Sequence, residues 1–199
     1  MAIVNLKKRQ IECKIVYYGP GRCGKTTNLE YIHKAFKKQV KGEMVSINTD
    51  GDRTLFFDFL PLELGKLKGC DVRVQLYTVP GQIKYNATRR LVLKGVDGIV
   101  FVADMEKSQR KENIASLKNL HQNLLEYNKN IFSIPLVFQY NKADLKAQNI
   151  PVMPVELLSR ELNARLRKPY VAASALTGKN VALTLKKITS MTISNLKNA

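Results

Sequence analysis

A chain of 199 residues is long enough for one well-buried domain and too short for two of ordinary size, so we expect a single domain over residues 1–199. Its composition, 45% hydrophobic and 25% charged, is that of a soluble globular protein, and no apolar run approaches the ~20 residues that span a bilayer. The net charge of +17 attracts anions, but the basic residues are dispersed from Lys7 to Lys197 without the charged tail or interleaved aromatics typical of nucleic-acid binding, so no specific nucleic acid is expected.

The beginning of the chain, residues 1–12, contains no apolar signal core with a cleavage site, and residue 2 is alanine rather than a myristoylated glycine. The last residues, NLKNA, offer no cysteine for prenylation. We therefore expect a cytoplasmic protein without a membrane anchor. The cysteines Cys13, Cys23 and Cys70 form no CxxC pair and are expected to be reduced thiols, and no cluster of His and Cys predicts a metal centre.

Short apolar runs alternate with helical patterns along the rest of the chain. The expected strands cover 12–19, 54–62, 71–79, 98–105, 134–141 and 169–175, and the expected helices cover 25–38, 114–125, 155–166 and 181–191. A short turn near 65–69 joins the second and third strands, which predicts an antiparallel pair. The other strands alternate with helices, which predicts parallel crossovers. The fold class is therefore α/β, with a doubly wound, mostly parallel sheet and one antiparallel edge pair.

The stretch GPGRCGKTT, residues 19–27, follows the first strand, opens the first helix and matches the phosphate loop G-x-x-x-x-G-K-[ST]. Its glycines let successive N–H groups point inward and form an anion nest at a helix N-terminus. Lys25 is expected to reach the β- and γ-phosphates of a nucleoside triphosphate, and the Thr26 hydroxyl to ligate Mg²⁺. The expected nucleotide-binding residues of this loop are Gly19, Gly21, Arg22, Cys23, Gly24, Lys25, Thr26 and Thr27.

A second motif, NKAD at 141–144, selects the base. The Asp144 carboxylate can accept hydrogen bonds from the ring N–H and the exocyclic amine of guanine, whereas adenine presents no amine there and would leave the carboxylate unpaired. The Lys142 stem can lie against the base, and Asn141 can tie this loop to the phosphate loop. The tripeptide SAL would supply a backbone N–H to the guanine carbonyl; it consists of Ser174, Ala175 and Leu176.

Taken in order, these motifs resemble those of the Ras-like small GTPases along nearly the whole chain. The resemblance implies the small G-protein fold, GTP and GDP as ligands, Mg²⁺ as the metal, and GTP hydrolysis that is slow without a regulator. The third family motif begins with aspartate, but here it reads TVPGQ, with Thr78 in that place. Thr78 and Gly81 are further expected nucleotide-binding residues. Thr78 cannot be a charged metal partner, so Asp58 on the neighbouring strand is a candidate to support Mg²⁺; the alternative is weaker metal binding.

Four longer segments are similar to the bacterial MglA family of Ras-like polarity and gliding-motility GTPases: KIVYYGPGRCGKTTN, DRTLFFDFLPL, LYTVPGQ and LKGVDGIVFVAD. This resemblance, which includes Thr78, implies a GTP-dependent switch that regulates the machinery of cell polarity or motility. It also implies a homodimeric roadblock-type regulator resembling MglB that stimulates hydrolysis, polarity or motility effectors, and a cytoplasmic protein that can concentrate at a cell pole.

Three residues are expected to carry hydrolysis, which requires a placed water and neutralised charge on the transferring phosphoryl group. Gln82 matches the water-orienting glutamine, and Thr54 matches the switch threonine that ligates Mg²⁺. Arg53 resembles an arginine finger supplied within the chain, worth roughly 10³–10⁵ in rate; the alternative is a surface arginine paired with Asp50 or Asp52. With Arg53 in the chain, a partner could accelerate hydrolysis by ordering the loop that carries it.

Two other functions remain open at this point. Thr78 is compatible with a scaffold that holds nucleotide but hydrolyses it poorly. The charge of +17 is compatible with a basic nucleic-acid-binding protein that uses GTP as a cofactor.

Overall fold

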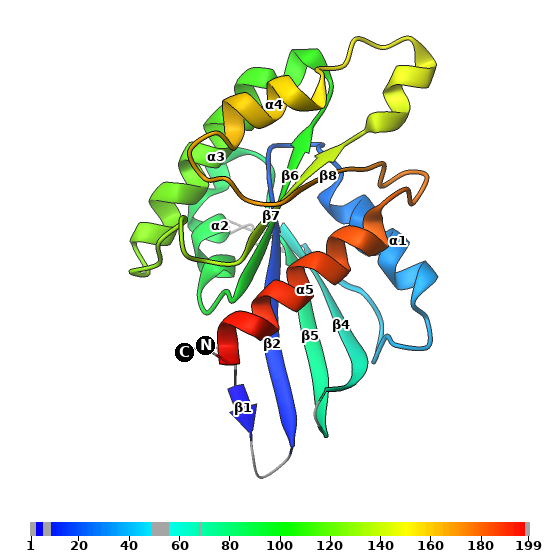
Figure 1. The fold of residues 1–199 in the computed structure, drawn as a ribbon, viewed down its shortest axis with the longest axis vertical. Helices are drawn as coiled ribbons and strands as arrows, with labels where there is room; N and C mark the ends of the chain where they lie inside the picture. The colour runs from blue at the N-terminus through cyan, green and yellow to red at the C-terminus, as the bar shows by residue number, and fades with distance from the viewer. Residues whose placement is uncertain (1–2, 6–8, 49–55, 68, 198–199) are drawn as a thin grey trace.

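The computed structural model describes residues 3–5, 9–48, 56–67 and 69–197 and contains one sheet flanked by helices (Figure 1). The strand order is β3-β4-β5-β2-β6-β7-β8, and β1 pairs with the first residues of β2. The strands are β1 (Ile3–Asn5), β2 (Gln10–Tyr18), β3 (Val45–Asn48), β4 (Phe56–Leu67), β5 (Cys70–Thr78), β6 (Gly98–Asp104), β7 (Leu136–Asn141) and β8 (Tyr170–Ala172). The helices are α1 (Lys25–Ala35), α2 (Asn86–Leu93), α3 (Arg110–Leu125), α4 (Val155–Leu162) and α5 (Val181–Lys197), with 3₁₀ turns η1 (Ile83–Tyr85), η2 (Lys107–Gln109) and η3 (Ala143–Gln148).

The predicted α/β fold is confirmed. Strand β2 is parallel to both β5 and β6, β6 is parallel to β7, and β7 is parallel to β8. Strand β4 runs antiparallel to β5, as the short connection between them predicted, but β3 rather than β4 is the strand at that edge. The short strands β1 and β3 were not predicted, and both add antiparallel pairings. The carboxyl ends of β2, β6 and β7 consequently meet at one edge, where ligands bind in sheets of this class.

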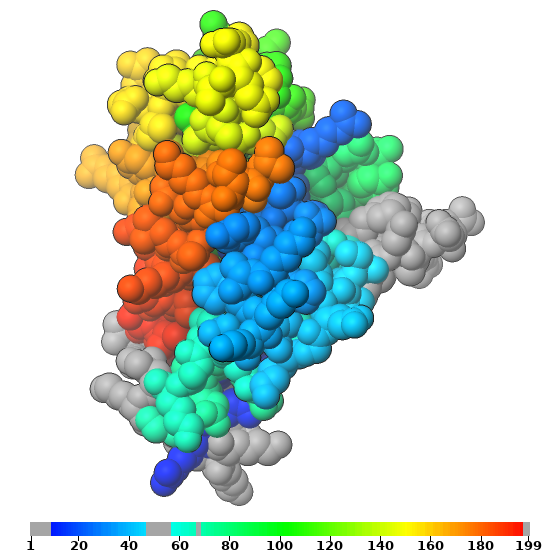
Figure 2. Space-filling view, turned by 90° about the vertical axis from the view of Figure 1, so that its right-hand side faces the viewer, coloured from blue at the N-terminus to red at the C-terminus, as the bar shows by residue number. Residues whose placement is uncertain are grey.

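Helices cover both faces of the sheet and enclose two apolar layers. Helices α1 and α5 lie side by side over one face (Figure 2), where Leu29, Ile32 and Leu185 pack on β2, β4 and β5. Helices α2, α3 and α4 cover the other face, where Leu93 and Leu120 are fully buried. Strands β6 and β7 are buried on both faces along their length, which agrees with their continuous apolar sequence. No helix within the described ranges is long and apolar enough to cross a membrane.

Several elements differ in length from their prediction, among them α1, β4 and β5. Helix α1 ends at Ala35 rather than at residue 38, because Val40 forms a bridge to Leu62 that draws the chain toward β4. Strands β4 and β5 extend further toward each other than expected: after a register shift between Glu63 and Lys66 the pairing resumes, and Leu67 pairs with Cys70. The β4–β5 hairpin is therefore longer than the sequence indicated.

The buried face of α3 also departs from the apolar stripe that the sequence suggested. Leu120 and Leu124 are buried as expected, but Leu125 is 55% exposed. A row of polar side chains is buried instead, and it comprises Asn113, Ser116, Asn119 and Asn123. Periodicity of apolar residues cannot detect such a face, because its buried side chains are polar and form hydrogen bonds to other elements, although Asn123 Oδ1 has no partner among the described residues.

The environments of the three cysteines predict their reactivity. Cys13 and Cys23 are buried, and burial raises the pKa of the Cys13 thiol to about 12 and also raises that of Cys23, whereas Cys70 is partly exposed. The thiolate is the reactive form, so at pH 8 we expect an aromatic disulfide reagent to titrate only Cys70 in the native chain. Denaturant should release all three thiols. A Cys70→Ser variant that still reacted rapidly when native would contradict the buried placement of the other two.

Candidate functional site

The phosphate loop connects the end of β2 to the first residue of α1, at the carboxyl edge of the sheet. Two of its glycines, Gly19 and Gly24, are required by close approach to other strands. An ideal Cβ on Gly24, whose φ is +95°, would lie 2.3 Å from Asn141 Nδ2, and one on Gly19 would lie 2.2 Å from the carbonyl oxygen of Val102. Side chains at these positions would push the loop away from β6 and β7. The loop therefore has the close backbone contacts that a phosphate nest needs.

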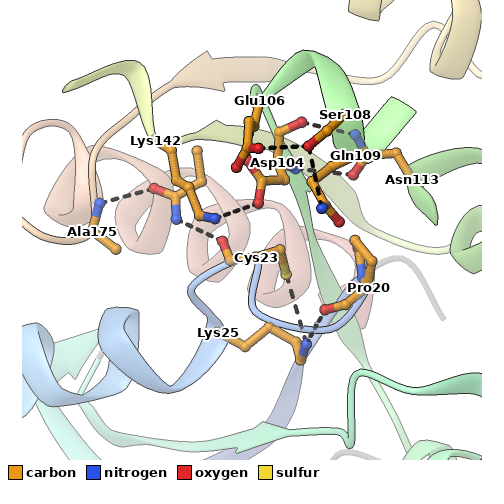
Figure 3. Close-up of polar contacts among 11 residues, drawn as sticks. Pro20, Cys23, Lys25, Asp104, Glu106, Ser108, Gln109, Asn113, Lys142 and Ala175 are labelled. Carbon is orange, nitrogen blue, oxygen red and sulfur yellow. Dashed lines mark hydrogen bonds and ion pairs between the residues drawn. The ribbon is translucent and has the colours of Figure 1, made fainter. Parts of the chain in front are cut away.

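Lys25 is buried at the base of this loop, with 7% of its surface exposed. Its ammonium donates to the carbonyl oxygen of Pro20 at 2.6 Å and lies 3.6 Å from Cys23 Sγ (Figure 3). It also donates to the Gly19 carbonyl oxygen at 3.3 Å. Burial chiefly, and the positive charge of Arg89 to a lesser extent, lower the pKa of Lys25. A cation that is buried among neutral oxygens is stabilised by an anion, so these contacts favour a phosphate at this position.

A cavity of about 440 Å³ opens beside Lys25, between the phosphate loop and the ends of β4 and β5. Its wall includes Thr26 and Thr27, the two hydroxyl residues after Lys25, and it also includes the loop after β5. Its lining consists of Arg22, Gly24, Lys25, Thr26, Thr27, Ser46, Phe57, Asp58, Thr78, Val79, Pro80 and Gly81. Five of the eight predicted phosphate-loop residues thus share one cavity with Thr78 and Gly81, whereas Gly19, Gly21 and Cys23 do not line it.

The Asp58 carboxylate lies in the wall of this cavity, with 8% of the residue exposed. Its Oδ2 accepts hydrogen bonds from the Thr26 hydroxyl at 2.7 Å and from the Thr78 hydroxyl at 2.8 Å, and its Oδ1 accepts one from Ser46 at 2.8 Å. The Asp58 backbone N–H donates to Thr78 Oγ1 at 2.9 Å. Thr78 therefore fixes both the main chain and the side chain of Asp58, next to the hydroxyl predicted to ligate Mg²⁺.

The residues that could hold Mg²⁺ are the Thr26 hydroxyl and the Asp58 carboxylate. Among the described residues, no group of three or more His, Cys, Asp and Glu side chains could enclose a metal ion by itself. Mg²⁺ is commonly bound through one or two carboxylates together with substrate phosphates and water rather than by a full protein cage. One buried carboxylate beside a hydroxyl, facing a phosphate-sized cavity, fits that pattern.

Asn141, the first residue of the base motif, connects three loops. Its Nδ2 donates to the carbonyl oxygen of Cys23 at 2.7 Å, and its Oδ1 accepts from the Ala175 N–H at 2.8 Å. The tie between the base loop and the phosphate loop that the sequence suggested is therefore present as a hydrogen bond. The Ala175 N–H already donates to Asn141, so the guanine carbonyl would have to compete for it. Leu176, the last residue of the tripeptide, is 74% exposed.

Asp144 has an unpaired oxygen at the base position. Its Oδ1 is buried, and no hydrogen-bond partner for it lies among the described residues. A buried carboxylate oxygen without a donor is destabilising, so it predicts a ligand that supplies one. The ring N–H and exocyclic amine of guanine are such donors.

Lys142 is held by Asp104, a residue that the sequence did not single out. The Lys142 ammonium forms an ion pair with Asp104 Oδ2 (Figure 3), and Asp104 Oδ1 accepts the Glu106 N–H. Burial raises the pKa of Asp104, and the contact with Lys142 opposes that rise. The ion pair anchors the end of the Lys142 side chain and fixes the course of its stem. Asp104 ends a wholly apolar strand, and a lone acidic residue in that position is its only sequence signal.

The loop after β5 touches the phosphate loop directly. An ideal Cβ on Gly81 would lie 2.2 Å from Gly21 Cα and 2.8 Å from the Pro20 carbonyl oxygen, so only glycine fits there. Gln82 follows Gly81 and has an exposed side chain. The structure thus brings Gln82 to the rim of the phosphate site. The other two predicted catalytic residues, Arg53 and Thr54, lie outside the described residues.

Comparison with known proteins agrees with this site. The model of the Ras family matches residues 14–194. Mutual gliding-motility protein MglA of Myxococcus xanthus is 49% identical over 99% of this chain and 98% of its own length. Ypt/Rab-type GTPase ypt7 of Schizosaccharomyces pombe is 24% identical over 96% of this chain and 86% of its own, and an uncharacterized protein of Methanocaldococcus jannaschii is 29% identical over 58% and 66%.

Proposed function

The chain belongs to the Ras family of small GTPases, and from that premise we propose that it is an MglA-like switch in which bound GTP or GDP selects the binding partners. The observation that carries this proposal is the position of Asn141, which joins the phosphate loop to the base loops while Asp144 keeps an unpaired acceptor for guanine. One domain over residues 1–199 would hold both ends of the nucleotide.

In the proposed complex, each loop has a separate task. Residues 19–27 and Gly81 surround the phosphates, with Lys25 released from the carbonyls of Gly19 and Pro20 to meet them. Asn141, Lys142 and Asp144, together with Ser174, Ala175 and Leu176, hold the base. Mg²⁺, when bound, neutralises phosphate charge, and Thr26, Thr54 and Asp58 are the residues proposed to hold it.

The missing aspartate at position 78 has a structural counterpart that supports this assignment. Asp58 supplies the charge from β4, and Thr78 orients it with two hydrogen bonds. The function of one family residue would therefore be divided between two strands. This arrangement favours a metal-supported switch over the alternative of loosely held nucleotide.

The biological role is proposed from the relative named for gliding motility. We propose that the chain regulates cell polarity or motility, that a homodimeric roadblock-type regulator resembling MglB stimulates its hydrolysis, and that it acts in the cytoplasm with enrichment at a pole. The side chains of Phe57 and Phe59 on β4 are half-buried and form an aromatic face with Tyr77 on β5, to which their ring centroids lie at 6.1 and 4.8 Å; Phe57 and Tyr77 also pack against the core layer under α2, α3 and α4. That aromatic face is the proposed partner surface.

The nucleotide recovered from purified protein tests the base assignment. Denaturation followed by chromatography should release GDP or GTP, because only guanine satisfies Asp144. Recovery of adenine nucleotide alone would overturn the proposal. Single-turnover phosphate release with and without a roadblock-type partner then separates a switch from a scaffold: a partner-dependent increase supports the switch, and a flat trace in both conditions supports the scaffold.

Variants of the hydrolytic residues should separate binding from turnover. We expect Arg53→Ala and Gln82→Leu to retain GTP affinity within about twofold, because neither supplies the main phosphate contacts, and to lose roughly 10²-fold or more of the stimulated rate. Stopped-flow phosphate release with the regulator measures that rate. Arg90→Ala is the matched control for Arg53, since Arg90 pairs with Glu126 on the surface. Normal stimulated rates in both variants would contradict their assignment.

A further inference from the structure

The largest side chain that is fully buried in the described part of the chain is a charged one. Arg89 on α2 has 0% exposed surface. No carboxylate of the described residues forms an ion pair with it. A buried charge without a counter-ion is unfavourable unless hydrogen bonds and a nearby ligand compensate for it. Its presence therefore calls for a function beyond filling the core.

Three neutral acceptors surround the Arg89 guanidinium. Its Nη1 donates to the Gly81 carbonyl oxygen at 2.8 Å, its Nε to the Tyr18 hydroxyl at 3.0 Å, and its Nη2 to Ser116 Oγ at 2.8 Å. The guanidinium carbon also lies 4.4 Å from the centre of the Tyr18 ring. The three bonds join the loop after β5 to β2 and α3, and a planar fork of donors fixes the direction of each.

The other members of this buried cluster hold the fork in place. The Tyr18 hydroxyl donates to Asn119 Oδ1 at 2.7 Å and accepts from Asn123 Nδ2 at 3.0 Å. Asn119 and Asn123 each donate to Asn86 Oδ1 at 2.8 Å, which ties the first residue of α2 to α3. This cluster is the polar face of α3 that the apolar pattern did not predict.

The contact with Gly81 leads directly to the phosphate site. Gly81 lies against Gly21 of the phosphate loop and precedes Gln82. Its carbonyl and the Gln82 N–H belong to one peptide plane, so a bond that fixes the carbonyl also fixes where the backbone of Gln82 begins. The charge of Arg89 is also felt at Lys25, whose pKa it helps to lower after burial.

We propose that Arg89 is a positioning residue for GTP hydrolysis: by holding the Gly81 carbonyl against β2 and α3, it orients the 81–82 peptide and the Gln82 side chain toward the phosphate site. The charge of the nucleotide's polyphosphate then compensates for the buried guanidinium. This inference rests on the proposed function, since it concerns the same site.

The first test compares Arg89→Lys with Arg90→Lys, the neighbouring surface residue. Lysine keeps the charge but cannot reach all three acceptors. We expect Arg89→Lys to lower the single-turnover rate of GTP hydrolysis roughly tenfold or more, the scale on which supporting residues act, while the Kd for GDP changes by less than about twofold. Arg90→Lys should change neither. An unchanged rate, or a loss of GDP affinity in proportion to the loss of rate, would overturn the proposal.

Two milder variants keep the test decisive if Arg89→Lys fails to fold. Ser116→Ala and Tyr18→Phe each remove one acceptor and leave the arginine in place. Both should slow hydrolysis in the same direction with smaller effects and unchanged GDP affinity. If neither slows hydrolysis although both fold, the fork does not position the loop.

A readout independent of turnover separates this proposal from the proposed function. Hydrogen exchange of a peptide covering residues 79–85 should become faster in Ser116→Ala and Arg89→Lys than in the unaltered chain and in Arg90→Lys. If the unaltered protein neither binds guanine nucleotide nor hydrolyses GTP, the proposed function fails whatever the variants do. If it does both and the 79–85 exchange is unchanged in the variants, only the role of Arg89 fails.

Discussion

Asp58→Asn is expected to lower the affinity for Mg²⁺ in the nucleotide complex by roughly 10–100-fold, the usual cost of losing a residue that supports a metal. The substitution preserves shape and one acceptor, and it removes the negative charge that the Thr26 and Thr78 hydroxyls converge upon. Titrating Mg²⁺ against the release rate of a fluorescent GDP measures the effect. In the unaltered protein, chelation of Mg²⁺ should strongly speed GDP release. In Asp58→Asn, GDP release should already be fast before Mg²⁺ is chelated.

The control for this experiment is Glu63→Gln, which makes the same change on the same strand. Glu63 is paired with Lys41 and Arg73 and lies away from the nucleotide cavity. A Thr78→Asp variant adds a further constraint. Made in the otherwise unaltered chain, it should lower the affinity for Mg²⁺ rather than raise it, because its carboxylate would face Asp58 where the hydroxyl now lies 2.8 Å away, and like charges at that distance repel. Equal Mg²⁺ dependence of Asp58→Asn and Glu63→Gln would assign the metal to other residues.

Asp144→Asn is expected to change which base is bound. Two hydrogen bonds to a charged group are worth about 1.5–3 kcal/mol each, so GTP binding should weaken by roughly 10-fold or more if one is lost and by roughly 10²-fold or more if both are lost. The amide N–H would instead suit xanthine, which has a carbonyl where guanine has its amine. Calorimetry with GTP and xanthosine triphosphate should therefore show affinity moving from the first ligand to the second.

Asp71→Asn is the matched control for this change. Asp71 is an exposed carboxylate at the start of β5, at the opposite end of that strand from Thr78, and its neutralisation changes the net charge equally. It should leave GTP affinity unaltered. Unchanged GTP affinity in Asp144→Asn as well would mean that the base is read elsewhere, and the base selectivity argued from residues 141–144 would be lost with it.

The parts of the site that could be predicted from sequence are those in which backbone geometry is encoded locally. The phosphate loop needs glycines at fixed spacing because Gly24 adopts a φ of +95° and approaches Asn141, and such constraints appear in the sequence as a motif. The base motif was found in the same way. Its fit to guanine could be argued from the hydrogen-bonding groups of Asp144 alone.

The parts that could not be predicted depend on residues that meet across the fold. Arg89 and Tyr18 are far apart in the chain, as are Asp104 and Lys142, and no local sequence pattern predicts that either pair is in contact. The polar face of α3 was hidden for a related reason, because the apolar periodicity that identifies a buried helix surface is absent there. Asp58 could be suggested because β4 and β5 were expected to pair, but the hydrogen bond that it accepts from Ser46 required the unpredicted strand β3.

The link that Asn141 makes has a consequence for how fast the bound nucleotide leaves. A side chain that bonds to Cys23 at one end and to Ala175 at the other prevents the two halves of the pocket from opening independently. The purine and its diphosphate tail should therefore leave together, and the time course of nucleotide release should follow a single exponential. An exchange factor that opened either half of the pocket would weaken binding of the whole nucleotide, so its docking surface need not overlap the hydrolytic centre.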